Sequence, residues 1–267
     1  MTSGSTREPS VPAPAAARSP YELLAARADR SRPFVTSYDG PGRCIELSVV
    51  STVNAIAKAS GLLRDELGLA PGDRLSLDLP VHWQLPVWTL AGLTTGLVVG
   101  RELGDHVEAR IVGPAGLSKL AQGAPWQADE VLGCACDAFG MPVAGGVPPG
   151  VLDVGIAVRA HPDAFQVERA AVAQAGLLMS EGPLSDRGVL LSWQAVLAAG
   201  PRDDVGARTW ISQEALSAAG LPASALLRRG AVDPVLCSGS VVLARGLSAA
   251  DEARLRELQG IAHDRGS

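Results

Sequence analysis

The chain has 267 residues and a mass of 27.4 kDa, enough for one large domain or two small ones. Its 47% apolar and 19% charged residues exclude a disordered or collagen-like protein. The net charge of −5 gives no basic surface for nucleic acid or an anionic membrane, so we expect neither as a partner. Four cysteines are too few for a disulfide scaffold of this size, which favours free thiols.

The first nineteen residues are rich in Ser, Pro, Ala and Arg, which predicts a disordered tail over residues 1–19. This tail has no continuous apolar stretch and does not resemble a secretory signal, so the expected localisation is cytoplasmic. Of the 23 basic residues only Lys58 and Lys119 are lysines, which leaves 21 arginines. Together with abundant Ala, Gly and Leu, this bias is typical of a bacterium with a GC-rich genome.

Residues 20–137 alternate between helix and strand patterns. Ser48 can cap a helix whose apolar residues recur at helical spacing until Gly68 ends it, and a Pro-Gly-Asp turn follows. The predicted order is helix 49–67, strand 74–79, helix 83–95, strand 97–99, strand 107–112, helix 115–122 and strand 131–136. Short connections between alternating strands and helices predict an α/β fold, a parallel sheet covered by helices.

A second predicted α/β half begins after residues 138–151, which are rich in Gly and Pro and predict a linker. This half covers residues 152–267. Its predicted strands are 153–159, 188–192, 207–211 and 235–244, and its predicted helices are 166–179, 212–219, 222–229 and 248–261.

No residue between Asp78 and Arg101 carries a formal charge, so this stretch must be weighed as a membrane span. A spanning helix needs about 20 mainly apolar residues. Pro80 and Pro86 interrupt the stretch, and His82 and several other polar residues dilute it. We therefore expect a strand end, a buried helix and a second buried strand.

Residues 33–100 carry a family resemblance in three pieces, PFVTSYDG, ELSVVSTVNAIAKASGLLRDELGLAPGDRLSLDLP and HWQLPVWTLAGLTTGLVVG. In this order they resemble the N-terminal part of the adenylate-forming enzymes, the acyl-CoA synthetase or AMP-binding superfamily. In that family a Tyr-containing strand precedes a helix, a Pro-Gly-Asp-Arg turn (here 71–74), a strand ending in Pro (here Pro80) and a further helix. SGSVVLARG at 238–246 is similar to a later strand of the family. The chain resembles most closely a small family of short, truncated AMP-binding-like proteins of high-GC bacteria without an assigned reaction.

The resemblance implies activation of a carboxylate with ATP, and ATP, AMP or acyl-CoA as ligands. Enzymes of this family need a Gly/Ser/Thr-rich phosphate loop followed by Lys, a Glu for Mg²⁺, an acidic ribose contact and a C-terminal domain with a catalytic Lys. The phosphate loop is expected near residues 155–170, where the chain has neither a lysine nor a glycine cluster. Because no lysine follows Lys119, both family lysines are missing, and we assign no catalytic residue.

Five residues are candidates for lining a ligand pocket: His82, Arg159, His161, Asp163 and Trp193. His82 follows a predicted strand and could lie at the carboxyl edge of the sheet, where α/β folds bind ligands. Arg159, His161 and Asp163 form the best charged cluster in the sequence. Trp193 follows a strand near the family's acyl pocket. The alternatives are a merely polar loop histidine at 82 and a core tryptophan at 193.

Cys134 and Cys136 form a CxC pair whose side chains share one side of a strand. Structural zinc needs CxxC pairs or Cys and His at set spacings, so we expect packing of small residues there and predict no metal site. No GxSxG, GxGxxG or GxxxxGK[ST] motif is present in the sequence.

Two functions from different classes follow from these observations. The first is a degenerate AMP-binding-like protein, a pseudoenzyme with a binding or accessory role. The second is an adenylate-forming or other enzyme with a modified nucleotide or acyl site, completed by a partner subunit. A protein partner or a homo-oligomer is expected, because a shortened relative exposes surface that longer relatives bury.

Overall fold

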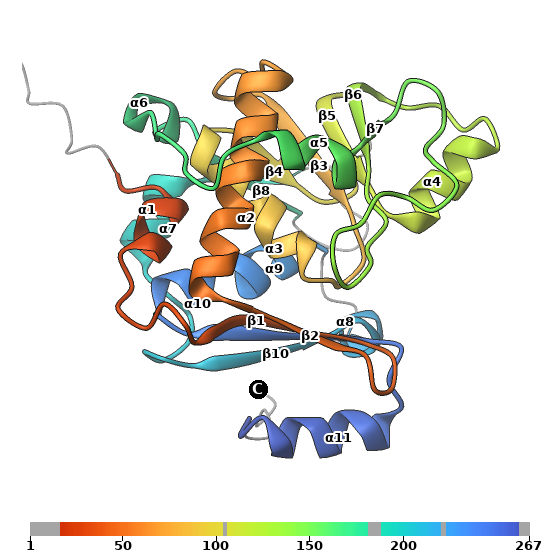
Figure 1. The fold of residues 1–267 in the computed structure, drawn as a ribbon. Helices are drawn as coiled ribbons and strands as arrows, with labels where there is room; N and C mark the ends of the chain where they lie inside the picture. Colours follow the sequence, from red (N-terminus) through yellow and green to blue (C-terminus); the bar gives the residue numbers. More distant parts are fainter. Residues whose placement is uncertain (1–16, 104–105, 181–187, 220–222, 262–267) are drawn as a thin grey trace, which may run out of the picture.

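The computed structural model describes residues 17–103, 106–180, 188–219 and 223–261. Its strands form two sheets with helices between and around them (Figure 1). Residues 1–16 of the predicted tail lie outside the described residues. Ser19, in contrast, is buried and caps α1 (Pro20–Ala25), because its hydroxyl accepts a hydrogen bond from the Glu22 N–H. The last residues of the predicted tail therefore belong to the fold.

The larger sheet has seven strands in the order β7-β6-β5-β3-β4-β8-β9. Neighbouring strands are parallel except β8 and β9, which are antiparallel. The strands are β3 (Arg74–Asp78), β4 (Val98–Gly100), β5 (Val107–Val112), β6 (Ala128–Gly133), β7 (Leu152–Asp153), β8 (Gly176–Ser180) and β9 (Gly188–Ser192). The predicted α/β fold with a parallel sheet covered by helices is confirmed.

The smaller sheet has four strands in the order β10-β11-β1-β2. Its strands are β1 (Pro33–Asp39), β2 (Cys44–Ser48), β10 (Arg208–Ser212) and β11 (Ser240–Arg245), and only β2 runs antiparallel to its neighbour. Strands from the beginning and the end of the chain thus pair directly. The larger sheet also joins strands from both sides of residues 138–151, so both sheets combine strands from before and after this segment.

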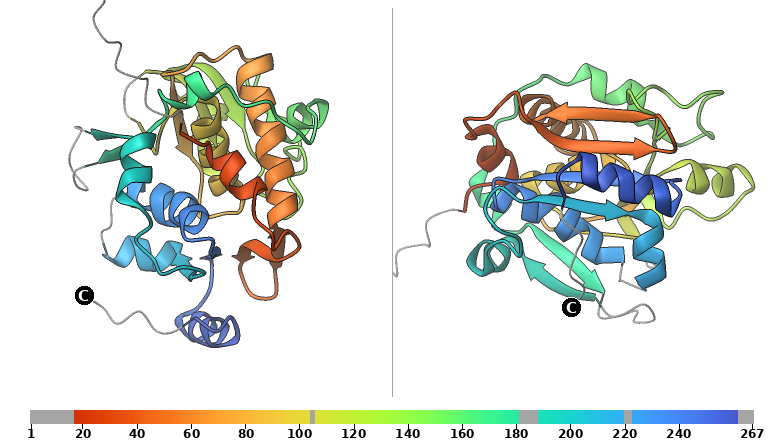
Figure 2. Two further views of the ribbon diagram at one scale, coloured as in Figure 1. Left: turned by 90° about the vertical axis from the view of Figure 1, so that its left-hand side faces the viewer. Right: turned by 90° about the horizontal axis from the view of Figure 1, so that it is seen from below.

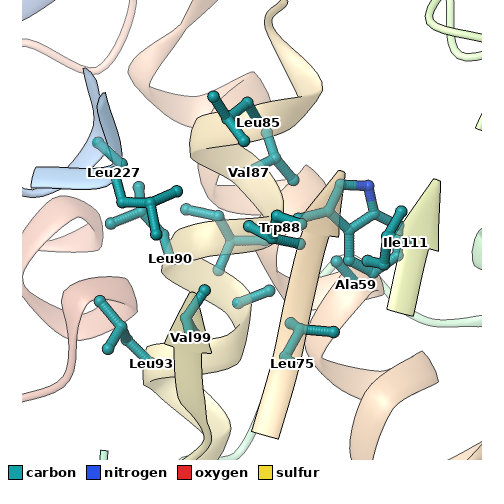
Figure 3. Packing of buried hydrophobic residues seen from close by; sticks show 14 of the residues in the cluster. Ala59, Leu75, Leu85, Val87, Trp88, Leu90, Leu93, Val99, Ile111 and Leu227 are labelled. Atoms are coloured by element: carbon teal, nitrogen blue, oxygen red, sulfur yellow. The ribbon is translucent and has the colours of Figure 1, made fainter. Parts of the chain in front are cut away.

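Helix α3 (Gln84–Thr95) lies at the centre of the molecule, and each of its residues is buried. Figure 3 shows its side chains reaching in two directions, Trp88 toward Ile111 of β5 and Leu90 toward Leu227. A helix buried on all sides can be apolar around its whole circumference, which accounts for the uncharged stretch between Asp78 and Arg101. The expected strand end, buried helix and buried strand are confirmed. In the described parts of the chain, no helix combines the length and apolar character needed to cross a membrane.

The other helices cover the sheets. They are α2 (Val49–Gly61), α4 (Pro114–Ala121), α5 (Val154–Ala157), α6 (Arg169–Val172), α7 (Trp193–Ala199), α8 (Gln213–Ala219), α9 (Ala223–Leu227), α10 (Asp233–Leu236) and α11 (Ala249–Leu258). Turns of tighter or wider helix lie at Leu62–Glu66, Val158–Ala160 and Arg228–Val232. Helix α11 lies across the face of the smaller sheet that is turned away from α2 and α3 (Figures 1 and 2). There it covers a small apolar cluster that includes Tyr38, Trp210 and Val242.

Three elements of the second half differ from the sequence prediction. Residues 166–179 hold only the short helix α6 and then β8, which pairs with β4. Residues 153–159 are mostly helical, because the Asp153 carboxylate accepts the Gly155 N–H and starts α5. The predicted strand 235–244 begins as α10, and the strand starts only at Ser240. Short apolar runs fit both the helical and the strand period, so their spacing alone could not decide between them.

Candidate functional site

The carboxyl ends of strands from both sheets meet at one place. Asp39 ends β1 and Arg245 ends β11, while His82 follows β3 and Asp137 follows β6. These four residues interact electrostatically around His82, and we call them the junction cluster. Ligands of α/β folds bind outside the carboxyl ends of parallel strands, so this cluster is the first place to look for a site.

Arg245 links the two sheets at the junction cluster. Its Nε donates to Asp39 Oδ1 at 2.9 Å, and its Nη2 donates to the Cys136 carbonyl at 3.2 Å. Its Nη1 makes no hydrogen bond with any described residue, and its side chain is 19% exposed. Arg245 therefore has a free donor through which it could hold an anion.

Helix α8 provides a second link between the sheets. Gln213 Oε1 accepts the Val81 N–H at 3.0 Å, directly before His82. Glu214 Oε1 accepts the Gly246 N–H at 2.7 Å, directly after Arg245. Through these bonds the first turn of α8 fixes both segments that carry the junction cluster.

The carboxylates at this junction do not fit the Mg²⁺ ion that the family resemblance implies. Asp39 is paired with Arg245, and Glu214 accepts a backbone N–H. Within the described ranges, no three His, Cys, Asp or Glu side chains lie close enough together to hold a metal ion. Mg²⁺ prefers several carboxylate or water oxygens around it, and this arrangement does not supply them.

His82 is only 2% exposed, which places it inside the junction and not on a loop surface. Burial lowers the pKa of His82 from the ordinary 6.5 to about 4, and the nearby charge of Arg245 acts in the same direction. Asp39 and Asp137 oppose this shift in the pKa only in part. His82 is therefore a neutral imidazole at pH 7, and the positive charge of the junction cluster resides on Arg245.

The CxC pair lies next to the junction, just beyond the end of β6. Cys134 and Cys136 are buried with their sulfur atoms 3.5 Å apart, and Cys134 Sγ donates to Gln84 Oε1 at 2.7 Å. The hydrogen bond with Cys136 and then burial raise the pKa of the Cys134 thiol well above its usual range. A thiol with a raised pKa is a poor nucleophile, which argues against a catalytic role for Cys134. The two buried cysteines pack as small side chains.

The structure places His161 and Asp163 away from the junction, against α2. His161 Nε2 lies 2.9 Å from Glu66 Oε2, and the Lys58 ammonium donates to the His161 carbonyl at 3.1 Å. Asp163 forms an ion pair of 3.0 Å with the same lysine. The structure thus brings these two residues together, but their contacts fasten the segment 155–170 to α2.

The other two candidates stand apart from this pair and from each other. Arg159 lies in the turn Val158–Ala160 directly after α5, and its Nη2 donates to Met141 Sδ at 3.4 Å. Trp193 is fully buried in the core, where its Nε1 donates to the Arg18 carbonyl at 2.9 Å. Among the five sequence candidates, only His82 therefore belongs to the junction cluster.

Sequence reasoning missed Asp39, Arg245 and the first turn of α8. A signal was available, since Asp39 and Arg245 end strands and Gln213 and Glu214 follow one directly. The sequence does not show that β1 pairs with β11, and it is this pairing that places Asp39 opposite Arg245. Contacts between strands 206 residues apart in the chain cannot be inferred from local spacing.

Several known proteins are similar to this chain. No protein-family model matches it. A Mycobacterium tuberculosis protein (strain ATCC 25618 / H37Rv), named "TIGR03089 family protein", is 38% identical over 143 residues, which cover 51% of this chain and 57% of that protein. An acyl-CoA synthetase from Brucella canis superposes with a TM-score of 0.69 at 16% identity, covering 92% of this chain and 46% of that one. Acetoacetyl-CoA synthetase from Streptomyces lividans gives 0.65 at 17% identity, covering 91% and 40%.

The chain has the fold of one part of an acyl-CoA synthetase. The resemblance that residues 33–100 carry is thereby confirmed for the fold, and it extends over nine-tenths of the chain. The chain spans 57% of the curated relative and less than half of each acyl-CoA synthetase named above. This coverage is consistent with the predicted correspondence to the N-terminal part of such enzymes.

Proposed function

We propose that this chain is a non-catalytic relative of the acyl-CoA synthetases that binds an anionic ligand at the junction cluster. The candidate ligands are acyl-CoA and adenine nucleotides. The proposed role of the chain is an accessory one, beside a full-length synthetase. The observation that carries the proposal is Arg245, which has an unused donor at the carboxyl edge of the sheets beside the neutral His82. A guanidinium can bind a phosphate or carboxylate at such a place even when no catalytic side chain stands beside it.

The positions of the lysines support binding without turnover. Lys58 is paired with Asp163 on α2, and Lys119 lies in the last turn of α4. The sequence has no other lysine, so none stands in the junction cluster to balance the charge that develops during adenylation. The carboxylates at the junction are already paired within the protein, which also disfavours Mg²⁺-dependent chemistry there.

A thermal-unfolding titration with Mg-ATP, AMP and a panel of acyl-CoAs tests the proposal. At 100 times its dissociation constant a ligand adds about 2.7 kcal/mol, a rise in Tm of roughly 5–10 °C for a chain of this size. We expect such a rise for one of these ligands, and its loss in Arg245→Gln. The exposed Arg43→Gln variant is the matched control, because Arg43 also contacts Asp39 but lies outside the junction cluster.

Pyrophosphate release should be measured in the same samples with a panel of carboxylic acids. We expect none above the rate of a protein-free sample. Release that is lost in Arg245→Gln would overturn the non-catalytic role. No thermal shift with any of the three ligand classes would overturn the binding role.

A partner-completed enzyme is the second candidate, and an exposed apolar surface favours it. Phe139 is 82% exposed, Ile156 63% and Met141 48%, all within one stretch of chain near α5. Solvent-exposed apolar side chains gathered in one region mark protein contacts more often than ligand sites. Light scattering of wild type and Phe139→Ser tests self-association. A strict monomer at high concentration for both would exclude the second copy as the partner.

A further inference from the structure

A second polar site lies at the opposite end of the smaller sheet. A cavity of about 460 Å³ opens between the start of β10, the segment before it and the end of α11. The carboxyl ends of β1 and β11 carry the junction cluster, whereas this cavity is reached at the amino end of β10. The volume lies within the range of sites that hold small molecules.

The cavity is lined mainly by arginine. Its charged lining residues are Arg202, Arg208, Arg229, Arg256, Asp203 and Asp204, which give a net positive charge. Guanidinium groups gathered around one cavity repel one another, so an anion inside it is electrostatically favoured.

Buried donors along the same wall have no acceptor. Trp210 is 7% exposed, and its indole N–H makes no hydrogen bond with a described residue. The Nε atoms of Arg208 and Arg256 are buried and equally without an acceptor in the described chain. Buried N–H groups are nearly always paired in proteins, so three unpaired donors in residues that line one cavity leave this wall with an uncompensated attraction for a negatively charged group.

The donors are held in place before any ligand arrives. The terminal nitrogens of Arg208 donate to Ser240 Oγ and Thr36 Oγ1 at 3.2 and 2.9 Å, which leaves only its Nε unpaired. Arg256 lies over the Trp210 ring at 5.4 Å, a cation–π contact that fixes both side chains. A wall ordered in this way loses little entropy when it binds a ligand.

From this geometry we propose that the cavity binds a phosphorylated small molecule that carries hydroxyl groups, such as a sugar phosphate. The phosphate would accept from the guanidinium groups of Arg202 and Arg256 and lie beside the Trp210 ring. The exposed carboxylate of Asp204, at the rim, would accept from hydroxyl groups. Inorganic phosphate alone would fill only a fraction of about 460 Å³, so the lining favours a larger molecule. This site is independent of the ligand proposed for the junction cluster.

The test follows the indole N–H resonances of the five tryptophans by NMR during titration with ribose 5-phosphate. The Trp210 resonance is identified by its absence in Trp210→Phe. We expect it to shift saturably with ribose 5-phosphate, and not with ribose. Arg202→Gln should weaken binding about tenfold, since it removes a charge-assisted contact from an exposed position. Arg254→Gln, exposed on α11 and outside the cavity lining, should bind like wild type.

Three results would overturn the proposal. The first is no saturable shift of the Trp210 resonance up to about 10 mM ribose 5-phosphate, a concentration at which even weak specific sites fill. The second is an equal shift with ribose, and the third is equal weakening in Arg202→Gln and Arg254→Gln. Because Arg245→Gln leaves this cavity intact, loss of nucleotide or acyl-CoA binding in that variant would not affect the outcome here.

Discussion

Acid should destabilise this protein through His82. The pKa of His82 is about 4 in the folded chain because of burial and the charge of Arg245, whereas in the unfolded chain it is near 6.5. Between these values the unfolded state binds a proton that the folded state does not, so stability falls as the pH falls from 6.5 to 4. Linkage gives a loss of about 2 kcal/mol at pH 5 relative to pH 8 from this residue alone.

Urea unfolding at pH 8 and pH 5, followed by far-UV circular dichroism, measures this contribution. His82→Gln has no titrating group, so it should lose about 2 kcal/mol less than wild type between the two pH values. Other groups, among them Asp233 with its raised pKa, contribute equally to both proteins and cancel in the comparison. His106→Gln is the control, because His106 is exposed and pairs with Asp129 on the surface. An identical loss in wild type and His82→Gln would refute a buried neutral imidazole.

Three substitutions test the packing that positions the sites. Gly96→Ala should destabilise by about 3 kcal/mol, because its φ is +92° and a Cβ would lie 2.4 Å from the Ala171 carbonyl oxygen. Gly68→Ala, with positive φ but open space, should cost only about 1 kcal/mol in the same urea assay. Arg228→Met should lower the unfolding free energy by about 3–5 kcal/mol, because it leaves the fully buried Asp233 carboxylate without its partner. Adding Asp233→Asn to Arg228→Met should recover part of that loss. If Arg228→Met alone were as stable as wild type, the ion pair would not contribute as argued.

Helices and strands with regularly spaced apolar residues and clear capping or turn residues at their ends were predictable from the sequence. The helix after Ser48, the buried helix at 84–95 and the strands at 74–78 and 107–112 lie within a few residues of their predicted bounds. Each has either a cap and an amphipathic face or a fully apolar run between turn residues. In these segments the local signal and the tertiary environment agree, so spacing alone was sufficient.

The second half shows why the rest could not be predicted. Residues 166–179 have helical spacing, yet Leu177 enters the larger sheet beside Val99 of β4. Local propensity is a weak preference that tertiary context overrides, so the pairing with β4 decides the conformation of this segment. The same limit applies to the candidate site, where His82 was found from its position after a strand, while Arg245 needed a partner from the other end of the chain.

The two ends of the smaller sheet differ in how completely the chain satisfies its own polar groups. At the carboxyl end, Arg245, Asp39, Gln213 and Glu214 bind one another or the backbone, which leaves Arg245 Nη1 as the donor that binds no described residue. At the amino end of β10, the Trp210 N–H and the Nε of Arg256 lack acceptors within the described chain. A buried donor without an acceptor costs free energy, and an anion nearby offsets part of that cost through its charge. A ligand at the junction cluster would therefore be held through one nitrogen of Arg245, whereas a ligand in the arginine-lined cavity would be held by two guanidinium groups, those of Arg202 and Arg256.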